Sequence, residues 1–414
     1  MTPRRIAAIA AAALSLAPAA ATAPAAARQP DLSAPSAILV QPDTKDVVVA
    51  RRARERRPIA STTKLMTALV TLERADLDDV VTAVPYDASP VESLMGLRAG
   101  ERVSIRDLLE GLLLASGNDA VATLARRVGG SQRRFVRMMN ERAREIGLTD
   151  TRFANPVGLD DPRNYSTAED LAKLALVLLR DDFFRRTVNR RSATVVSGGR
   201  RRTIVNRNVL VREVPWMTGV KTGHTSQAGY VLVGSSTRRG VRFVSAVLGT
   251  PSEAARDADT LALMRYGQRR YRRVAALRRG AVLARPALDH RADEHVDVVA
   301  ARTVRAVVRR GQRPTVRVTG VPDELTGPLR RGARVGTAIV AYRGRELARV
   351  PLVTAEAVPA AGIADKVTSA LPPLWLLALL AAVLACSLHV VLRHRRRVRR
   401  RRARARRRRG TETA

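Results

Sequence analysis

The chain has 414 residues, of which 46% are hydrophobic, and this composition excludes a globally disordered protein. Its length allows about two to three domains of ~100–200 residues each. The formal net charge is +37, because 74 lysines and arginines stand against 37 acidic residues. Such a surface favours anionic partners such as wall polymers or lipid head groups, although a genome-wide preference for arginine accounts for it equally well.

The N-terminus predicts a secretory signal peptide over residues 1–27. Arg4 and Arg5 form a short basic start, residues 6–17 are apolar, and the small residues 25–27 offer a cleavage site. No cysteine lies nearby, which excludes a lipoprotein anchor. The chain that follows is therefore expected to be exported.

A strand pair and a helix are the first elements expected after a linker rich in proline, alanine and serine. Hydrophobic runs at 37–40 and 47–50 predict a hairpin across the turn 42–45. A basic segment then leads to a helix that begins at about Ser61, because apolar residues follow at helical spacing as far as Leu72.

Further helices are expected over the next hundred residues. Residues 105–128 predict two apolar helices joined at Ser116 and Gly117, and residues 131–147 predict an amphipathic helix. Thr167 is expected to cap another helix, since an acidic residue stands three positions later.

Short strands replace helices from residue 194 onward. The β-rich runs 229–237 and 241–248 flank a turn and predict an antiparallel hairpin, after which a helix over 251–271 closes the unit. Residues 28–272 therefore predict one α+β domain, with an antiparallel sheet flanked by helices and a helical lobe.

A small β-rich domain is expected over residues 275–360. Its alternating runs are separated by glycine, proline and arginine turns, at 296–300, 304–308, 315–318, 338–342 and 349–354. The segment contains no candidate catalytic cluster. Residues 361–373, rich in alanine and proline, predict a linker.

The C-terminus predicts a transmembrane helix over residues 374–392. These 19 residues carry no formal charge, and at ~1.5 Å per residue such a helix spans a hydrocarbon core of ~30 Å. Thirteen arginines follow between Arg393 and Arg409. The positive-inside rule then places the tail 393–414 in the cytoplasm and the rest of the mature chain outside, on a single-pass cell-membrane anchor.

Two smaller expectations follow from this end of the chain. The only cysteine, Cys386, lies in the predicted span, so the exported part has no disulfide although its compartment permits one. A basic tail can bind nucleic acid, but beside a membrane span an orientation signal is the simpler account. No nucleic-acid partner is therefore expected.

Three short motifs carry the candidate chemistry. They are the stretches 61–64 (Ser-Thr-Thr-Lys), 116–118 (Ser-Gly-Asn) and 221–223 (Lys-Thr-Gly). Each is common by itself, but all three occur in this order and in the expected structural contexts. The chain has only five lysines against 69 arginines, and two of the five lie in these motifs. Because arginine keeps its proton, lysine at these two positions indicates chemistry that needs a side chain able to release its proton.

A helix that begins at Ser61 places Lys64 one turn further on the same face. A serine is a poor nucleophile until a base removes its proton. Neutral Lys64 can act as that base if the pocket and a neighbouring cation lower its pKa. Ser116 can pass a proton to a leaving nitrogen, and Asn118 can hold either Lys64 or a substrate amide.

The third motif offers a surface for a peptide. Lys221, Thr222 and Gly223 lie on a predicted edge strand, whose free backbone groups can pair with an extended substrate. Lys221 is expected to add a fixed positive charge to the pocket. No metal or cofactor is expected for this chemistry.

The chain resembles the low-molecular-mass penicillin-binding proteins, which are serine-type D-Ala-D-Ala carboxypeptidases. The resemblance covers about residues 36–270 and is strongest at 59–67, 114–120 and 220–225. It implies a serine DD-peptidase/β-lactamase-like domain that removes the terminal D-alanine from peptidoglycan stem peptides and is covalently inhibited by β-lactams. The segment 275–360 resembles the C-terminal β-domain of the family only loosely.

The resemblance also implies catalytic roles. Ser61 would form the acyl-enzyme, and Lys64 would be the general base. Ser116 and Asn118 would assist proton transfer.

Substrate-binding roles follow from the same resemblance. Lys221, with Thr222 and Gly223, would belong to the substrate-binding strand. The backbone N–H groups of Ser61 and His224 would form the oxyanion hole. Arg256 would hold the terminal carboxylate of the substrate, with an ordinary surface arginine on a helix as the alternative.

Three other functions stay open at this point. A class A β-lactamase deacylates with a Glu-x-x-Leu-Asn loop, and no Leu-Asn dipeptide occurs in the chain. A DD-endopeptidase that acts on cross-links would use the same residues. A non-catalytic membrane receptor or wall-binding protein with a degenerate enzyme domain is the third alternative, against which the intact motifs argue.

Overall fold

The computed structural model describes residues 28–289, 291–362 and 374–409. The expected signal peptide and most of the expected linker at 361–373 lie outside these residues. The described chain forms two compact units, one of residues 28–238 and 242–270, the other of residues 239–241 and everything from 271 onward.

A five-stranded sheet forms the centre of the first unit, with the order β2-β1-β11-β10-β9. The expected hairpins are confirmed, and β9 is an edge strand because it pairs only with β10 in this sheet. The strands are β1 (Ser36–Gln41), β2 (Asp46–Arg51), β9 (Met217–Thr225), β10 (Gly229–Arg238) and β11 (Val241–Thr250).

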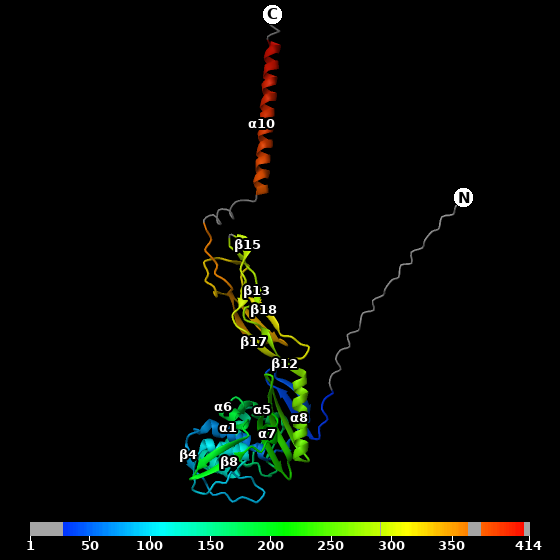
Figure 1. Ribbon diagram of the computed structural model, residues 1–414. Coiled ribbons are helices and arrows are strands. Elements are labelled where there is room, and N and C mark those ends of the chain that lie inside the picture. The colour runs from blue at the N-terminus through cyan, green and yellow to red at the C-terminus, as the bar shows by residue number, and fades with distance from the viewer. Residues whose placement is uncertain (1–27, 290, 363–373, 410–414) are drawn as a thin grey trace, which may run out of the picture. The chain divides into compact units, whose positions relative to one another are not determined.

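Helices cover each face of this sheet. Successive residues of a strand point to opposite faces, so neighbouring side chains pack against different helices. Ile38 belongs to the large core that also contains residues of α1 (Lys64–Arg74) and α5 (Ala168–Leu178). Its neighbour Leu39 faces α8 (Glu253–Arg270), where a Cβ added to Gly267 would lie 3.0 Å from the Leu39 side chain. Figure 1 shows α8 on one side of the strands and α1, α5 and α6 on the other.

The other helices include the pair that carries the second motif. The predicted pair over 105–128 is confirmed, but the first helix of the pair continues as a single π-helical turn, η2 (Gly111–Ala115), up to the junction. The helices are α2 (Ile105–Glu110), α3 (Asn118–Gly129), α4 (Gln132–Glu145), α6 (Asp182–Val188) and α7 (Val209–Glu213).

Side-chain caps begin several of these helices. The predicted cap at Thr167 is confirmed, since its hydroxyl accepts the backbone N–H of Asp170 at 3.0 Å. Ser104 and Ser131 cap α2 and α4 in the same way. The helix expected from Ser61 differs in its first turn, which is a 3₁₀ helix, η1 (Ala60–Thr63), that passes directly into α1.

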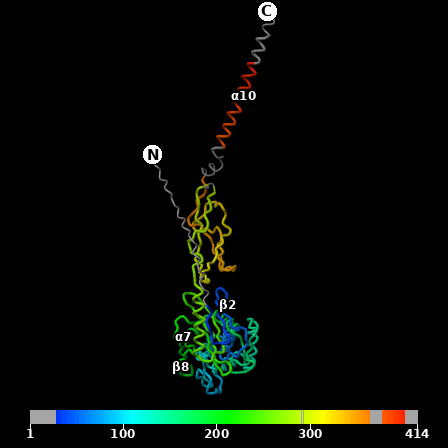
Figure 2. Tube along the Cα trace, turned by 90° about the vertical axis from the view of Figure 1, so that its right-hand side faces the viewer, coloured from blue at the N-terminus to red at the C-terminus, as the bar shows by residue number. Residues whose placement is uncertain are grey.

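Three short strand pairs complete the first unit. The longest is the hairpin of β7 (Ser192–Ser197) and β8 (Arg200–Val205). Figure 2 shows β8 and α7 on the same side of this unit. The other pairs are β3 (Arg57–Pro58) with β6 (Tyr165–Ser166), and β4 (Val80–Thr82) with β5 (Arg102–Ser104).

The second unit is rich in β-structure, with its core in a five-stranded sheet of order β13-β16-β21-β20-β18. Its remaining strands form the pair β12-β17 and the three-stranded sheet β15-β14-β19. The strands are β12 (Tyr271–Leu277), β13 (Val282–Ala284), β14 (Ala287–Leu288), β15 (Arg291–His295), β16 (Val298–Ala300), β17 (Val304–Arg309), β18 (Thr315–Thr319), β19 (Glu324–Leu325), β20 (Arg334–Tyr342) and β21 (Arg345–Thr354).

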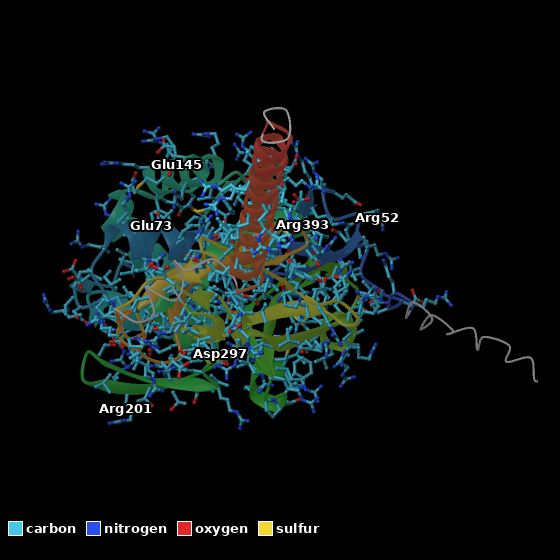
Figure 3. The ribbon with its side chains drawn as sticks, turned by 90° about the horizontal axis from the view of Figure 1, so that it is seen from above. Arg52, Glu73, Glu145, Arg201, Asp297 and Arg393 are labelled. Atoms are coloured by element: carbon cyan, nitrogen blue, oxygen red, sulfur yellow. The ribbon has the colours of Figure 1, made fainter. Side chains whose placement is uncertain are left out.

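A single long helix, α10 (Leu374–Arg409), ends the described chain. Its segment Leu376–Arg400 is long and apolar enough to cross a membrane. The helix continues without a break from the apolar run into the arginine-rich tail, where Arg393 lies (Figure 3). Figure 3 also shows Arg52 and Arg201 projecting outward, as expected of charged side chains at the surface.

Candidate active site

The nucleophile candidate and its base lie in consecutive turns of one helical segment. Ser61 belongs to η1, and Lys64 is the first residue of α1. The Lys64 side chain is completely buried, and its Nζ donates to Ser61 Oγ at 2.9 Å and to the carbonyl oxygen of Val157 at 2.6 Å. Two acceptors therefore fix the amine against the hydroxyl.

The carbonyl of Val157 is held in place by its own loop. Asn155 Oδ1 accepts the backbone N–H groups of Gly158 at 2.7 Å and Leu159 at 3.1 Å. Gly158 has a φ of +88°, and a Cβ there would lie 2.1 Å from the carbonyl oxygen of Ala60. Only glycine allows this close approach of the loop to the Ser61 turn.

The surroundings favour the neutral amine of Lys64. Burial is the main cause that lowers its pKa well below the ordinary value, and the positive charges of Lys221 and Arg207 lower the pKa further. Glu92 and Asp119 oppose this shift with their negative charges. With its pKa lowered in this way, Lys64 can be neutral and accept a proton from Ser61.

The second motif lies where η2 meets α3. Ser116 has the left-handed conformation, with a φ of +66°, and this bend breaks the helix between the two segments. Its Oγ is buried and has no hydrogen-bond partner among the described residues. The hydroxyl is therefore free to exchange a proton with a bound molecule.

Asn118 takes a partner that the sequence did not indicate. Its Nδ2 donates to Glu92 Oε2 at 2.5 Å, and the hydroxyl of Tyr86 donates to the same oxygen. Of the two partners considered for Asn118, Lys64 and a substrate amide, Lys64 forms no hydrogen bond with it among the described residues. Instead, Asn118 Oδ1 is buried there without a partner.

The loop that carries Glu92 is anchored by backbone contacts to the same motif. The backbone N–H of Asn118 donates to the carbonyl of Ser93 at 2.7 Å. The carboxylate of the next residue, Asp119, accepts the backbone N–H groups of Met95, Gly96 and Leu97, each at 2.9 Å. These bonds hold the loop over the motif.

The third motif lies on β9, as expected, beside the Ser61 turn. Lys221 is buried, and its Nζ donates to the carbonyl of Thr222 at 3.0 Å. A Cβ on Gly223 would lie 3.0 Å from the backbone nitrogen of Ser61, which shows how closely the strand approaches this turn. The first and third motifs, far apart in the sequence, therefore lie next to each other in the structure.

The positive charge expected on Lys221 is not fixed near neutral pH. Burial lowers its pKa to about 7, and the positive charges of Arg207 and Arg256 contribute to the shift. At this pKa, Lys221 exchanges its proton in the neutral range.

A single cavity of about 590 Å³ joins these elements. Its lining includes Ser61, Ser116, and the stretch Thr222, Gly223 and His224. His224 is exposed and stacks on Tyr230 with ring centroids 4.0 Å apart. The cavity is also lined by Thr203 and Val205 of β8 and by Val209 of α7.

Three arginines make this cavity cationic. Arg207, Arg212 and Arg256 line it, against the single carboxylate of Glu253. Arg256 is buried, with its guanidinium 2.7 Å from Glu253 and 2.8 Å from Asp257. The alternative of a surface arginine at this position is therefore wrong, because only 3% of its side chain is exposed.

Arg207 was not singled out from the sequence, where it is one of 69 arginines. Its guanidinium has no hydrogen-bond or ion-pair partner among the described residues, and its charge acts on both buried lysines. Arg207 differs from the other arginines in its position between Asn206 and Asn208, whose buried side chains form hydrogen bonds with the backbone.

Metal ligation has no candidate in the described part of the chain, which contains no group of three histidine, cysteine, aspartate or glutamate side chains fit to hold an ion.

Comparison with known proteins gives two matches to protein families. The sequence profile of the D-alanyl-D-alanine carboxypeptidase family matches residues 23–252. That of the C-terminal domain of penicillin-binding protein 5 matches residues 271–360.

Individual proteins match over most of the chain. D-alanyl-D-alanine carboxypeptidase DacD of Escherichia coli is 35% identical over 345 residues, which cover 80% of this chain and 88% of the relative. DacF of Bacillus subtilis is 29% identical over 363 residues, which cover 84% and 92%. Penicillin-binding protein 5 of Haemophilus influenzae superposes with a TM-score of 0.58 at 28% identity, over 80% of this chain and 99% of the other. The Streptomyces K15 DD-transpeptidase gives a TM-score of 0.56 at 33% identity, over 58% and 99%.

Proposed function

The chain belongs to the D-alanyl-D-alanine carboxypeptidase family, and on this premise we propose that it removes the terminal D-alanine from peptidoglycan stem peptides. The reaction proceeds through an acyl-enzyme on Ser61, and β-lactams acylate the same hydroxyl. One observation carries the proposal: the buried amine of Lys64 lies 2.9 Å from Ser61 Oγ, at a cavity shared with the edge strand β9.

The substrate binds as an extended chain along the free edge of β9, whose outward backbone groups are available for pairing. Its scissile carbonyl then lies against Ser61. The backbone N–H groups of Ser61 and His224 stabilise the oxyanion, and such donors are worth roughly 10²–10³ each in rate.

Acylation begins when neutral Lys64 takes the proton of Ser61 as the oxygen attacks the carbonyl carbon. Ser116, whose buried Oγ has no other partner among the described residues, gives its proton to the nitrogen of the leaving D-alanine and takes up the proton that Lys64 removed from Ser61, so that Lys64 becomes neutral again. The C–N bond breaks, D-alanine leaves, and the peptide stays on Ser61 as an ester. A water molecule, activated by the same amine, then hydrolyses this ester.

The terminal carboxylate of the substrate is bound by the cationic wall of the cavity. Arg256 is already paired with two carboxylates, so it acts as a fixed part of this wall. Arg207 has a guanidinium without a partner in the described structure and is the group free to form a new ion pair. Thr222 contributes a hydroxyl at the same place.

The chain is further proposed to work at the outer face of the cell membrane. The apolar segment Leu376–Arg400 supports an anchor at the C-terminus. The signal peptide 1–27, the catalytic domain 28–272, the β-domain 275–360, the linker 361–373, the span 374–392 and the cytoplasmic tail 393–414 are the proposed parts. The arginines of the tail support this orientation.

Mass spectrometry tests the proposal directly. Full-length protein incubated with benzylpenicillin is expected to gain one covalent adduct on Ser61, and a D-Ala-D-Ala peptide is expected to lose one D-alanine. The variant Ser61→Ala should do neither. An unchanged rate of D-alanine release by this variant would overturn the catalytic proposal, and rapid repeated turnover of benzylpenicillin by the wild type would identify a β-lactamase instead.

A further inference from the structure

A side-chain amide has a donor end and an acceptor end of almost the same shape. Which end of Asn118 faces the catalytic groups therefore decides what it can bind. Its neighbour on one side is Glu92, whose Oε2 lies 2.5 Å from Asn118 Nδ2. An ionised carboxylate only accepts hydrogen bonds, so the donor end of the amide must face Glu92.

Hydrogen bonds from other groups fix the Glu92 carboxylate beside Asn118. The hydroxyl of Tyr86 donates to the same oxygen as Asn118, and the backbone N–H of Ser89 donates to Oε1 at 3.1 Å. Burial by itself would raise the pKa of Glu92, but these donors and the charge of Lys64 lower it below the ordinary value. Glu92 is therefore an ionised acceptor throughout the neutral range.

The acceptor end of Asn118 consequently lies on the opposite side. Oδ1 is buried and has no partner among the described residues, which is costly unless another group binds to it. Asn118 lies two residues after Ser116, which lines the cavity, and the charge of Glu92 acts on Lys64. The free acceptor therefore belongs to a residue within one helical turn of the cavity wall.

We infer that Glu92 is a positioning residue, which fixes the Asn118 amide so that its carbonyl oxygen serves as an acceptor for the N–H of a bound substrate or of Lys64. This inference depends on the proposed function, because it assigns a role within that reaction. Glu92 acts through Asn118 and does not touch the reacting atoms.

A purely structural role for Glu92 is separable from this one. The loop stays anchored without it, since the Ser93 carbonyl binds Asn118 N–H and the Asp119 carboxylate binds three backbone N–H groups. Loss of the Glu92 charge therefore frees the amide to rotate while the loop stays in place.

The test is a double-mutant cycle on the rate of acylation by benzylpenicillin. Glu92→Gln preserves the shape, but its amide can donate to Asn118 as well as accept from it. We expect the acylation rate to fall by about tenfold to a hundredfold, the range for a buried polar group that loses its partner. In the background Asn118→Ala, the same change should alter the rate by less than about twofold.

A surface variant and a second background test whether the change in rate comes from the contact between Glu92 and Asn118. Glu73→Gln makes the same chemical change on the surface, where Glu73 pairs with Arg142 at 2.7 Å, and it should leave the acylation rate unchanged. Asn118→Ser provides a second background if Asn118→Ala does not fold.

An equal loss with and without the Asn118 amide would overturn the inference, as would an unchanged rate for Glu92→Gln. A wild type that forms no adduct at Ser61 would instead refute the proposed function, so the two failures are distinguishable.

Discussion

Buried Lys221 lowers the pKa of buried Lys64, although the two lysines lie on different elements, β9 and α1. Burial disfavours the charged form of an amine, and the positive charge of Lys221 makes the charged form of Lys64 less favourable still. Because the Lys64 amine contacts Ser61 and must be neutral to act as a base, Lys221 is the cation that helps to keep it so.

This relationship predicts a bell-shaped pH dependence for acylation. The rate should rise as pH increases through the lowered pKa of Lys64, since only the neutral amine accepts a proton. It should fall again as Lys221 loses its own proton at a pKa of about 7, because the positive charge near the cavity that attracts the carboxylate of the substrate is then smaller. Stopped-flow acylation by a chromogenic cephalosporin, measured across pH, checks both limbs.

The matched control is Lys173→Met, which removes a half-buried lysine that pairs with Glu169 and Asp170 and does not line the cavity, and it should leave the profile unchanged. Lys221→Met should abolish the alkaline limb. An alkaline limb that survives in Lys221→Met would show that another group titrates there.

Removal of the base is the second prediction. Lys64→Met keeps much of the length of the buried side chain but cannot accept a proton. We expect the acylation rate to fall by roughly 10²–10⁴, the usual contribution of a general base. The melting temperature should stay the same or rise, because a desolvated amine is replaced by an apolar group.

Retention of stability distinguishes lost chemistry from lost structure in this variant. Circular dichroism and thermal unfolding give the comparison with wild type. Acylation of Lys64→Met at more than about a tenth of the wild-type rate would contradict the assignment of Lys64 as the base.

Close packing between β9 and the Ser61 turn leads to the third prediction. In Gly223→Ala, the added Cβ would meet the backbone nitrogen of Ser61 at 3.0 Å and the Cβ of Ala60 at 3.1 Å. One of the two segments must shift by a few tenths of an ångström. We expect a loss of acylation of about tenfold or more, because reacting groups are sensitive to displacements of this order.

The control for Gly223 is a glycine whose replacement strains the backbone away from the cavity. Gly147 follows α4 with a φ of +73° and has no atom within 4 Å of an added Cβ. Gly147→Ala should cost ~1 kcal/mol of unfolding free energy with an unchanged acylation rate. Equal acylation by Gly223→Ala and wild type would show that the strand tolerates the shift.

Much of this site could be predicted from the sequence because its parts have local signals. Ser61 and Lys64 are three residues apart in a helical pattern, and the Lys221 motif directly precedes the β-rich hairpin of residues 229–248. The helix junction at Ser116 and Gly117 directly follows an apolar run that ends at Ala115. Each motif therefore identifies its own element.

The remaining parts of the site depend on contacts between distant residues. Glu92 lies in a segment without periodicity, and its position is set by bonds to Asn118 and Asp119 and their helix. Arg207 cannot be told from the other arginines until the chain folds. The pKa of Lys221 could not be predicted from the sequence either, because it depends on burial and on two arginines that lie elsewhere in the sequence.

The β7–β8 hairpin supplies the last prediction, since a buried ion pair holds it to the loop before β5. Glu101 accepts from Arg202 and from Ser197, both at 2.5 Å, and only 4% and 9% of the Glu101 and Arg202 side chains are exposed. Glu101→Gln should therefore cost ~3 kcal/mol of unfolding free energy, because it leaves the arginine charge buried without its counter-ion. Urea denaturation measures this loss.

The pH dependence of that stability has a definite sign. Burial by itself would raise the pKa of Glu101, but Arg202 and Ser197 lower it below the ordinary value. The stabilisation is therefore present above the unfolded pKa of about 4.3 and is lost as pH falls through the lower, folded value. In Glu101→Gln, this part of the acid destabilisation should disappear.

A functional effect should accompany the loss of stability, because Thr203 and Val205 of the same hairpin line the cavity. A displaced hairpin weakens substrate binding but leaves Ser61 and Lys64 in contact. We therefore expect Glu101→Gln to raise KM for a D-Ala-D-Ala peptide by several-fold, with kcat within about twofold of wild type. Glu145→Gln, at an exposed pair with Arg142, should change neither stability nor KM. A fall in kcat with constant KM would show instead that the ion pair supports the catalytic groups themselves.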